Sequence, residues 1–282
     1  MTSPFTPAYG GQPVLLGTSW KMNKTLDEAL DFVDSLLVMP VPASVDAFVL
    51  PAHTALAAVR ARLPRDSRVR VGAQNAHWAP EGAFTGEVSM RMVRDAGASM
   101  VEIGHSERRA AFAETDDDVR RKVAAALEHG LVPLVCVGES AADRDAGAAE
   151  SFVAAQVGAA LAGAAGADSR TILFAYEPVW AIGTGGRAAA PEDVAPVLGV
   201  VRQVAAEVLD GPPVRVLYGG SVDEDNASSL LDGTDADGLF VGRAALSAAA
   251  FQRLIALCAQ RSTSSPQPFT QIDHEVHHAA CR

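Results

Sequence analysis

The chain has 282 residues, a length that suits one large domain or two small ones. Hydrophobic residues make up 49% of it, and 23 Lys and Arg against 34 Asp and Glu give a net charge of −11. Non-specific nucleic-acid binding needs a basic surface, so this charge argues against a nucleic-acid partner. Three scattered cysteines, Cys136, Cys258 and Cys281, are typical of free thiols in a reducing compartment.

The two ends of the chain carry no targeting signal that we recognise. Residues 1–12 lack the basic and apolar regions of a secretory signal, and no apolar run approaches the ~20 residues of a membrane span. We therefore expect a cytoplasmic protein with no membrane partner. Residues 1–12 are expected to be a flexible segment and the polar residues 261–282 a disordered tail, whose "HEVHH" offers no preformed metal geometry.

Short apolar runs alternate along the chain with longer helical patterns. The runs that we interpret as strands are Val14–Gly17, Ala47–Leu50, Val69–Ala73, Met100–Ile103, Val132–Val137, Thr171–Tyr176, Val214–Tyr218 and Gly238–Val241. The helical patterns are Leu26–Val38, Thr54–Leu63, Ser89–Ala96, Asp117–His129, Ala148–Ala164, Pro191–Leu209, Glu224–Leu231 and Ala244–Ala259. Near-continuous hydrophobic runs are typical of parallel strands that are buried on both faces. The pattern predicts an α/β fold, a single-domain (β/α)8 barrel over residues 13–260, with an open doubly wound sheet as the alternative.

The active site of such a barrel is built at the C-terminal ends of the strands. The residues that directly follow the runs are Ser19 and Lys21, His105 and Glu107, Cys136 and Glu139, Glu177, and the glycine turns at 219–221 and 242. A carboxylate base, a histidine, a lysine and a phosphate cradle together suit proton transfer beside a carbonyl. Neither a metal-ligand cluster nor a dinucleotide fingerprint is present, so no metal and no cofactor are predicted.

The residues after Glu177 form a predicted lid over the site. The lid consists of Pro178, Val179, Trp180, Ala181, Ile182, Gly183, Thr184 and Gly185. The proline stiffens its start and the glycines permit large dihedral changes, so the segment can close over a substrate and exclude water. An ordinary glycine-rich loop is the alternative.

Eight motifs follow one another along the chain: "WKMN", "GAQN", "TGEVS", "GHSERR", "CVGE", "YEPVWAIGTG", "YGGSV" and "DGLFVGR". Together they resemble the signature set of the triosephosphate isomerase family and cover roughly residues 13–260. By this resemblance Glu177 is the catalytic base, His105 the electrophile that shuttles protons, and Lys21 the cation that holds the phosphate and the oxyanion, which are known roles in that family. Glu107 resembles the buried partner of the lysine region, and Cys136 a supporting, non-nucleophilic cysteine.

The resemblance extends to the phosphate site and to the assembly. Gly183, Ser221 and Gly242 resemble backbone donors to the substrate phosphate. Residues 74–86 resemble the loop that inserts into a neighbouring subunit, with Thr85 near its tip and a bulky Trp78 at the subunit seam. The resemblance therefore implies a homodimer that acts on a small phosphorylated sugar.

Several residues depart from the family pattern near the substrate. Ser19 stands where the family has Asn, Arg243 follows Gly242 where a second glycine is usual, and the lid continues as Gly186-Arg187-Ala188. The combination of "GTSWKMNKT", "HWA" and "GLFVGR" resembles the branch of bacterial L-erythrulose 1-phosphate isomerases. That branch implies conversion to D-erythrulose 4-phosphate in tetritol catabolism. Ser19 would free space and offer a hydroxyl to the larger substrate, and Arg243 would lie near the phosphate, unless it is a surface arginine that begins the last helix.

Two other functions compete with this interpretation. One is ordinary triosephosphate isomerase activity, the interconversion of dihydroxyacetone phosphate and D-glyceraldehyde 3-phosphate in glycolysis and gluconeogenesis. The other is a non-catalytic phosphosugar-binding protein that keeps the barrel. The retained Glu177, His105 and Lys21 argue against the second, because a pure binder does not need a base.

Overall fold

The computed structural model describes residues 12–182 and 186–261, and these form a closed parallel barrel. The strands are β1 (Val14–Ser19), β2 (Val45–Leu50), β3 (Val69–Ala73), β4 (Met100–Ile103), β5 (Val132–Val137), β6 (Leu173–Tyr176), β7 (Arg215–Tyr218) and β8 (Gly238–Val241). They pair in sequence order, and β1 pairs with β8 in parallel to close the barrel. The predicted (β/α)8 barrel is therefore confirmed, and the open sheet is excluded.

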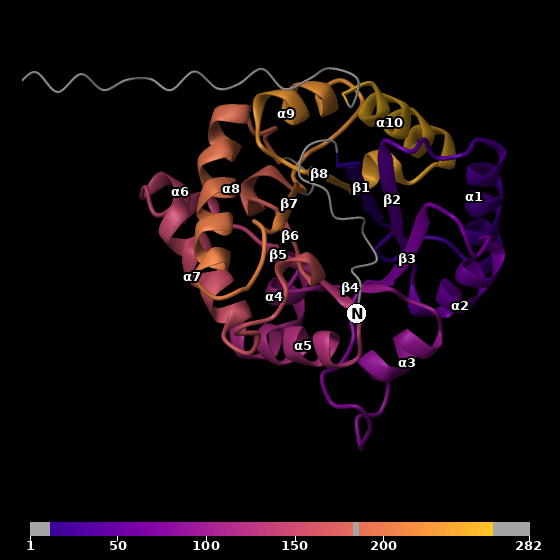
Figure 1. Cartoon of the computed structure of the whole chain (residues 1–282), viewed down its shortest axis with the longest axis horizontal. Coiled ribbons are helices and arrows are strands. Elements are labelled where there is room, and N and C mark those ends of the chain that lie inside the picture. Colours follow the sequence, from indigo (N-terminus) through magenta and orange to yellow (C-terminus); the bar gives the residue numbers. More distant parts are fainter. Residues whose placement is uncertain (1–11, 183–185, 262–282) are drawn as a thin grey trace, which may run out of the picture.

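Helices surround the strands as a ring, as Figure 1 shows. They are α1 (Leu26–Val38), α2 (His53–Arg62), α3 (Met90–Asp95), α4 (Ser106–Phe112), α5 (Asp116–Glu128), α6 (Ala141–Asp145), α7 (Ala149–Leu161), α8 (Pro191–Ala206), α9 (Ala227–Gly233) and α10 (Ala248–Arg261). Short 3₁₀ turns lie at Ser169–Thr171, Val179–Ala181 and Arg243–Ala245. The helical segments between successive strands bring the chain back for the next parallel strand, and two such connections, β4 to β5 and β5 to β6, contain two helices each.

Local signals in the sequence explain where several helices begin and end. Thr25 caps α1 through a capping box with Glu28, and Thr115 caps α5 in the same way with Asp118. Gly130 ends the α5 segment in a left-handed conformation, with φ +67°, which a glycine adopts without steric cost.

The apolar residues form two cores, one on each face of the sheet. The inner core fills the barrel and consists of Leu15, Phe48, Leu50, Met100, Val132, Leu134, Cys136, Leu173, Ala175, Leu217 and Phe240. The larger outer core lies between the strands and the helices. Gly17 makes room for this filling, because a Cβ there would lie 1.9 Å from the Phe48 ring. Both faces of the strands are thus buried, as the continuous apolar runs predicted.

The structure moves some predicted boundaries. The last helix begins at Ala248 rather than Ala244, because residues 243–245 form a 3₁₀ turn, and it runs through Arg261, which we had placed in the tail. The strand predicted from Thr171 begins at Leu173, after a 3₁₀ turn. The helix predicted at Glu224 begins at Ala227. The predictions for residues 1–11, for "HEVHH" and for Cys281 concern residues that lie outside the described ranges. Among the helices of the described ranges, none is long and apolar enough to cross a membrane.

Candidate active site

Lys21 lies two residues beyond β1, in a backbone conformation that is unusual for a side-chain-bearing residue. Its φ is +52°, a left-handed value that costs ~1 kcal/mol or more unless the surroundings hold it. Gln74 supplies that hold, since its amide nitrogen donates to the carbonyls of Lys21 at 3.0 Å and of Leu50 at 2.9 Å. The Lys21 Nζ then lies 2.6 Å from Glu107 Oε1. Burial acts to lower the pKa of Lys21, but the hydrogen bond and charge of Glu107 outweigh it and raise the pKa. The Lys21 side chain therefore stays protonated at physiological pH.

The residues around Lys21 fix the turn that carries it. Trp20 is fully buried and meets the Phe32 ring edge-on at 4.9 Å. The Asn23 amide donates to the Trp20 carbonyl at 2.7 Å, and Lys24 Nζ donates to the Leu246 carbonyl at 2.6 Å. The "WKMN" motif is therefore an anchored turn that presents one lysine to the end of the barrel.

His105 precedes α4, and its ring state follows from its hydrogen bonds. The backbone N–H of Glu107 donates to His105 Nδ1 at 3.1 Å. Since Nδ1 is an acceptor there, the ring hydrogen of the neutral imidazole lies on Nε2, which faces Glu177. Burial, and then the charge of Lys21, lower the pKa of His105 to about 4. The imidazole is therefore neutral at physiological pH and can donate from Nε2.

Glu177 follows β6, and its carboxyl group is almost without polar partners. Its Oε2 lies 3.2 Å from His105 Nε2, but among the described residues this buried oxygen has no hydrogen-bond partner of proper geometry. Burial raises the pKa of Glu177 well above its usual value, and the nearby Glu102 adds to the rise. Gly219 leaves room for the side chain, since a Cβ there would lie 2.6 Å from Glu177 Cγ. A carboxylate with a free oxygen and a raised pKa is suited to accept a proton.

The carboxylate that we expected to be buried beside the lysine is exposed. Glu107 does pair with Lys21, but its side chain is 58% exposed, because it stands on the first turn of α4 at the cavity mouth. The buried carboxylate is instead Glu102 in β4, which sequence reasoning missed. The charged residue within the apolar run "MVEI" is the signal that would have found it.

Cys136 lies in β5 with its sulfur 4.0 Å from Glu102 Oε1. Burial raises the pKa of this thiol well above its usual value, and the charges of Glu177 and Glu102 act in the same direction. The thiol is thus protonated at physiological pH, and a protonated thiol is a poor nucleophile.

Lys21, His105 and Glu177 line one cavity of about 440 Å³ at the C-terminal ends of the strands. The predicted site residues that line it are Ser19, Lys21, His105, Glu107, Glu177, Ile182, Ser221, Gly242 and Arg243. Arg243 begins the 3₁₀ turn after β8 rather than a long helix. The cavity is of the size that binds a small molecule, and Lys21 and Arg243 give it two cations.

The first half of the predicted lid is anchored to the barrel. Residues 179–181 form a 3₁₀ turn, and Trp180 Nε1 donates to the buried Glu139 Oε1 at 2.6 Å. The Ser221 hydroxyl donates to the Ala181 carbonyl at 2.6 Å, so the turn after β7 and the predicted lid are in contact. The predicted lid residues Gly183, Thr184 and Gly185 lie outside the described ranges.

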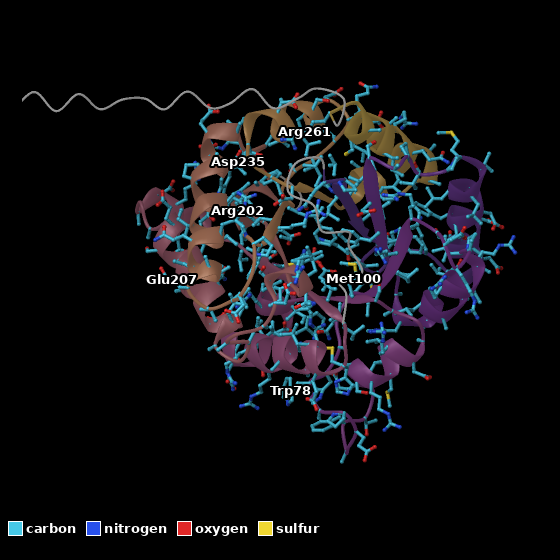
Figure 2. The ribbon with its side chains drawn as sticks, in the orientation of Figure 1. Trp78, Met100, Arg202, Glu207, Asp235 and Arg261 are labelled. Carbon is cyan, nitrogen blue, oxygen red and sulfur yellow. The ribbon has the colours of Figure 1, made fainter. Side chains whose placement is uncertain are left out.

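The loop over residues 74–86 projects beyond the ring of helices near α3 (Figure 1). Trp78 lies at its base (Figure 2), stacked on His77 at 4.1 Å, with the Arg121 guanidinium 5.4 Å from its ring centre. Thr85 is exposed near the tip. Trp78 is thus held by its own chain, and the protruding tip is free to contact another molecule.

Over the described ranges, no group of three or more His, Cys, Asp and Glu side chains is placed to hold a metal ion. The site is a lysine, a neutral histidine and a buried glutamate at the C-terminal end of a (β/α)8 barrel. This arrangement defines a class of barrel enzymes that move protons on small anionic substrates.

Comparison with known proteins narrows this class. The family model for triosephosphate isomerase matches residues 14–258, so the chain belongs to the triosephosphate isomerase family. The chain is 45% identical over 260 residues to an L-erythrulose-1-phosphate isomerase of Mycolicibacterium smegmatis, covering 91% of this chain and 97% of that protein. It is 48% identical over 233 residues to a protein of the same name from Mesorhizobium japonicum, covering 82% and 91%. A third, from Rhizobium rhizogenes, is 45% identical over 250 residues, covering 87% and 95%.

Proposed function

We propose that this protein isomerises L-erythrulose 1-phosphate to D-erythrulose 4-phosphate through an enediolate. The observation that carries the proposal is the pairing of an intact Lys21, His105 and Glu177 with Ser19 at the floor of their cavity. The names of the relatives from three bacterial species, each at least 45% identical, support the same substrate.

We assign each group a task in the reaction that its position and its pKa support. The Glu177 carboxylate removes the proton from C3 of the ketose, and the neutral His105 donates the Nε2 hydrogen toward the carbonyl oxygen on C2. Lys21 stabilises the negative charge that develops on the enediolate oxygens. His105 then takes the proton from the C3 oxygen, and protonated Glu177 returns its proton to C2. The carbonyl has moved from C2 to C3, and no atom is gained or lost.

We place the substrate phosphate beside Lys21, Arg243 and the turns at Ser221 and Gly242. Lys21 and Arg243 supply positive charge, and the turns at Ser221 and Gly242 supply backbone N–H groups. Ile182 lines the cavity, and the lid that contains it would cover the substrate and exclude water, which protects the enediolate from loss of phosphate.

We also propose that the protein acts as a cytoplasmic homodimer. The projecting loop over residues 74–86 supports the dimer, because its tip carries Phe84, a large apolar side chain that is 46% exposed. The sparse cysteines support a reducing compartment.

The test is a comparison of kcat/KM for L-erythrulose 1-phosphate and D-glyceraldehyde 3-phosphate with the purified full chain. We expect a clear preference for the four-carbon ketose. Higher efficiency on the triose would replace the proposal with ordinary triosephosphate isomerase activity. Glu177→Asp serves as the control for catalysis, since unchanged turnover on both substrates would indicate that Glu177 is not the base.

A further inference from the structure

Glu102 places a carboxylate inside the barrel, where nothing in the fold itself requires one. It lies in β4 on the same face as Met100, which Figure 2 labels near the middle of the barrel. Only 3% of Glu102 is exposed, and the inner core around it is apolar. Burial of a carboxylate in such surroundings is unfavourable, so the residue is expected to serve the site above it.

The contacts of Glu102 lead directly to the cavity. The Ser19 hydroxyl donates to Glu102 Oε2 at 2.9 Å, and the Cys136 sulfur lies 4.0 Å from Glu102 Oε1. Strands β1 and β4 are not neighbours in the barrel, so the bond from Ser19 crosses its interior. Ser19 also lines the cavity, whereas Glu102 lies beneath it. Glu102 therefore acts on the substrate through Ser19.

The hydrogen bond fixes what Ser19 can offer to a ligand. A serine hydroxyl has one hydrogen to donate and two lone pairs that can accept. When the hydrogen is given to Glu102, only lone pairs of the oxygen are left for the cavity. Ser19 then accepts a hydrogen bond from a ligand hydroxyl and has no hydrogen to give to a ligand.

We propose that Glu102 is a positioning residue for substrate selection, which holds the Ser19 oxygen as an acceptor for the terminal hydroxymethyl group of a phosphorylated four-carbon ketose. The proposal rests on the proposed function and deepens it. A three-carbon substrate lacks this hydroxymethyl group on the reacting carbon, so it leaves the Ser19 oxygen unpaired. A polar atom that a substrate leaves unpaired discriminates strongly against that substrate.

The ionisation of Glu102 is consistent with this arrangement. Burial raises the pKa of Glu102 to about 7, and the hydrogen bond from Ser19 is the largest of the influences that oppose the rise. The charged groups that act on it are Lys21, Glu107 and Arg108, and the buried Glu177 also interacts with it. Assays at pH 8.5 therefore examine the ionised form, which accepts the Ser19 hydrogen.

The experiment compares two replacements of Glu102 that differ in one property. Glu102→Gln removes the charge but keeps an oxygen that can accept from Ser19, whereas Glu102→Met removes the acceptor and keeps the length. For each variant, kcat/KM is measured at pH 8.5 with L-erythrulose 1-phosphate and with dihydroxyacetone phosphate. The ratio compared is kcat/KM for L-erythrulose 1-phosphate divided by kcat/KM for dihydroxyacetone phosphate. We expect Glu102→Met to lower this ratio about 10- to 100-fold and Glu102→Gln to keep it within about 3-fold of the wild-type value.

Ser19 and its neighbour on the strand supply the controls. Ser19→Ala is expected to lower the ratio as Glu102→Met does, and the double variant to lose no more than either alone. Thr18→Val, on the opposite face of β1 with a buried hydroxyl that has no partner among the described residues, is expected to leave the ratio unchanged. If Glu102→Met does not fold, Glu102→Val replaces it, since it also removes the acceptor. Ser19→Ala then tests independently whether loss of the Ser19 oxygen lowers the ratio.

Three outcomes overturn the role of Glu102. In the first, Glu102→Met lowers kcat/KM equally for both substrates. In the second, Glu102→Gln lowers the ratio of the two kcat/KM values as much as Glu102→Met does. In the third, the double variant at Ser19 and Glu102 lowers the ratio by the product of the two single effects. The second outcome would mean that Glu102 acts through its charge on Glu177 rather than through Ser19. A wild-type preference for the triose overturns the proposed function itself, so the two failures are distinguishable.

Discussion

The space that Gly219 leaves for Glu177 provides a direct test of how closely the base must be placed. A Cβ at residue 219 would lie 2.6 Å from Glu177 Cγ and 2.7 Å from its Oε1. An ordinary contact between carbon atoms is about 3.5 Å, so Gly219→Ala forces the Glu177 side chain to retreat by about 0.9 Å. A misplacement of about 1 Å in a reacting group costs up to about 100-fold in rate.

We therefore expect Gly219→Ala to lower kcat about 30- to 100-fold on the preferred ketose phosphate. Gly219 belongs to the same turn as Ser221, so competitive inhibition by inorganic phosphate is measured as well, to separate an effect on phosphate binding from the effect on kcat. Steady-state kinetics and competitive inhibition by phosphate measure the two effects separately.

Gly199→Ala is the matched control for this substitution. Gly199 lies in α8, and a Cβ there would meet no atom within 4 Å. We expect unchanged activity and a gain in stability of about 0.5–1 kcal/mol, because alanine favours a helix over glycine. If Gly219→Ala folds and retains kcat within about 3-fold, the close confinement of Glu177 is irrelevant to the reaction and our reasoning is wrong.

Three further predictions concern ionisation, the substrate and the lid. Because the base must be ionised and the pKa of Glu177 is raised, activity should fall as pH decreases at a value well above 4.5. His105, whose pKa is about 4, should add no second step above pH 5 in the profile of kcat/KM. Ser19→Asn should lower the four-carbon to three-carbon ratio of kcat/KM at least about 10-fold, because it fills the space beside the substrate. Trp180→Phe removes the donor to buried Glu139 and should lower kcat about 2- to 10-fold in steady-state assays, since a hydrogen bond contributes about 0.5–1.5 kcal/mol.

Each of these expectations has a clear contrary result. An acid limb at pH 4.5 would mean that burial does not raise the pKa of Glu177. An unchanged ratio in Ser19→Asn would remove Ser19 from substrate selection. Full turnover in Trp180→Phe, with thermal unfolding as the check on the fold, would show that this anchor does not matter for catalysis.

Sequence patterns predicted the elements of the barrel well wherever burial requires apolar residues. The bounds of β3, β4, β5 and β8 match the predicted runs, because strands that are covered on both faces are apolar at most of their positions. The helices α4 and α6 were missed for the converse reason. Neither has a buried residue, so neither carries an apolar period that sequence reasoning can detect.

Within the site, residues that belong to local sequence motifs were predicted, whereas contacts between residues distant in the sequence were not. Lys21, His105 and Glu177 were identified because each follows a strand within a recognisable motif. The partnership of Ser19 with Glu102 spans 83 positions, and only the closed barrel brings the two side chains together. Periodicity reports which face a residue is on, but it does not report which residue stands across the barrel from it.

Three of the carboxylates at this site, Glu107, Glu177 and Glu102, have surroundings that suit each to a different task. Burial would raise the pKa of Glu107, but the hydrogen bond and charge of Lys21 outweigh it and lower the pKa, so this residue stays an anion that holds the lysine. Burial leaves Glu177 with a raised pKa and an unpartnered oxygen, which suits a group that takes and returns a proton. Glu102 lies between these extremes, since Ser19 stabilises its charge without cancelling the effect of burial. One side-chain type thus provides an anchor, a base and a positioning group, because the fold sets how much water and which partners each can reach.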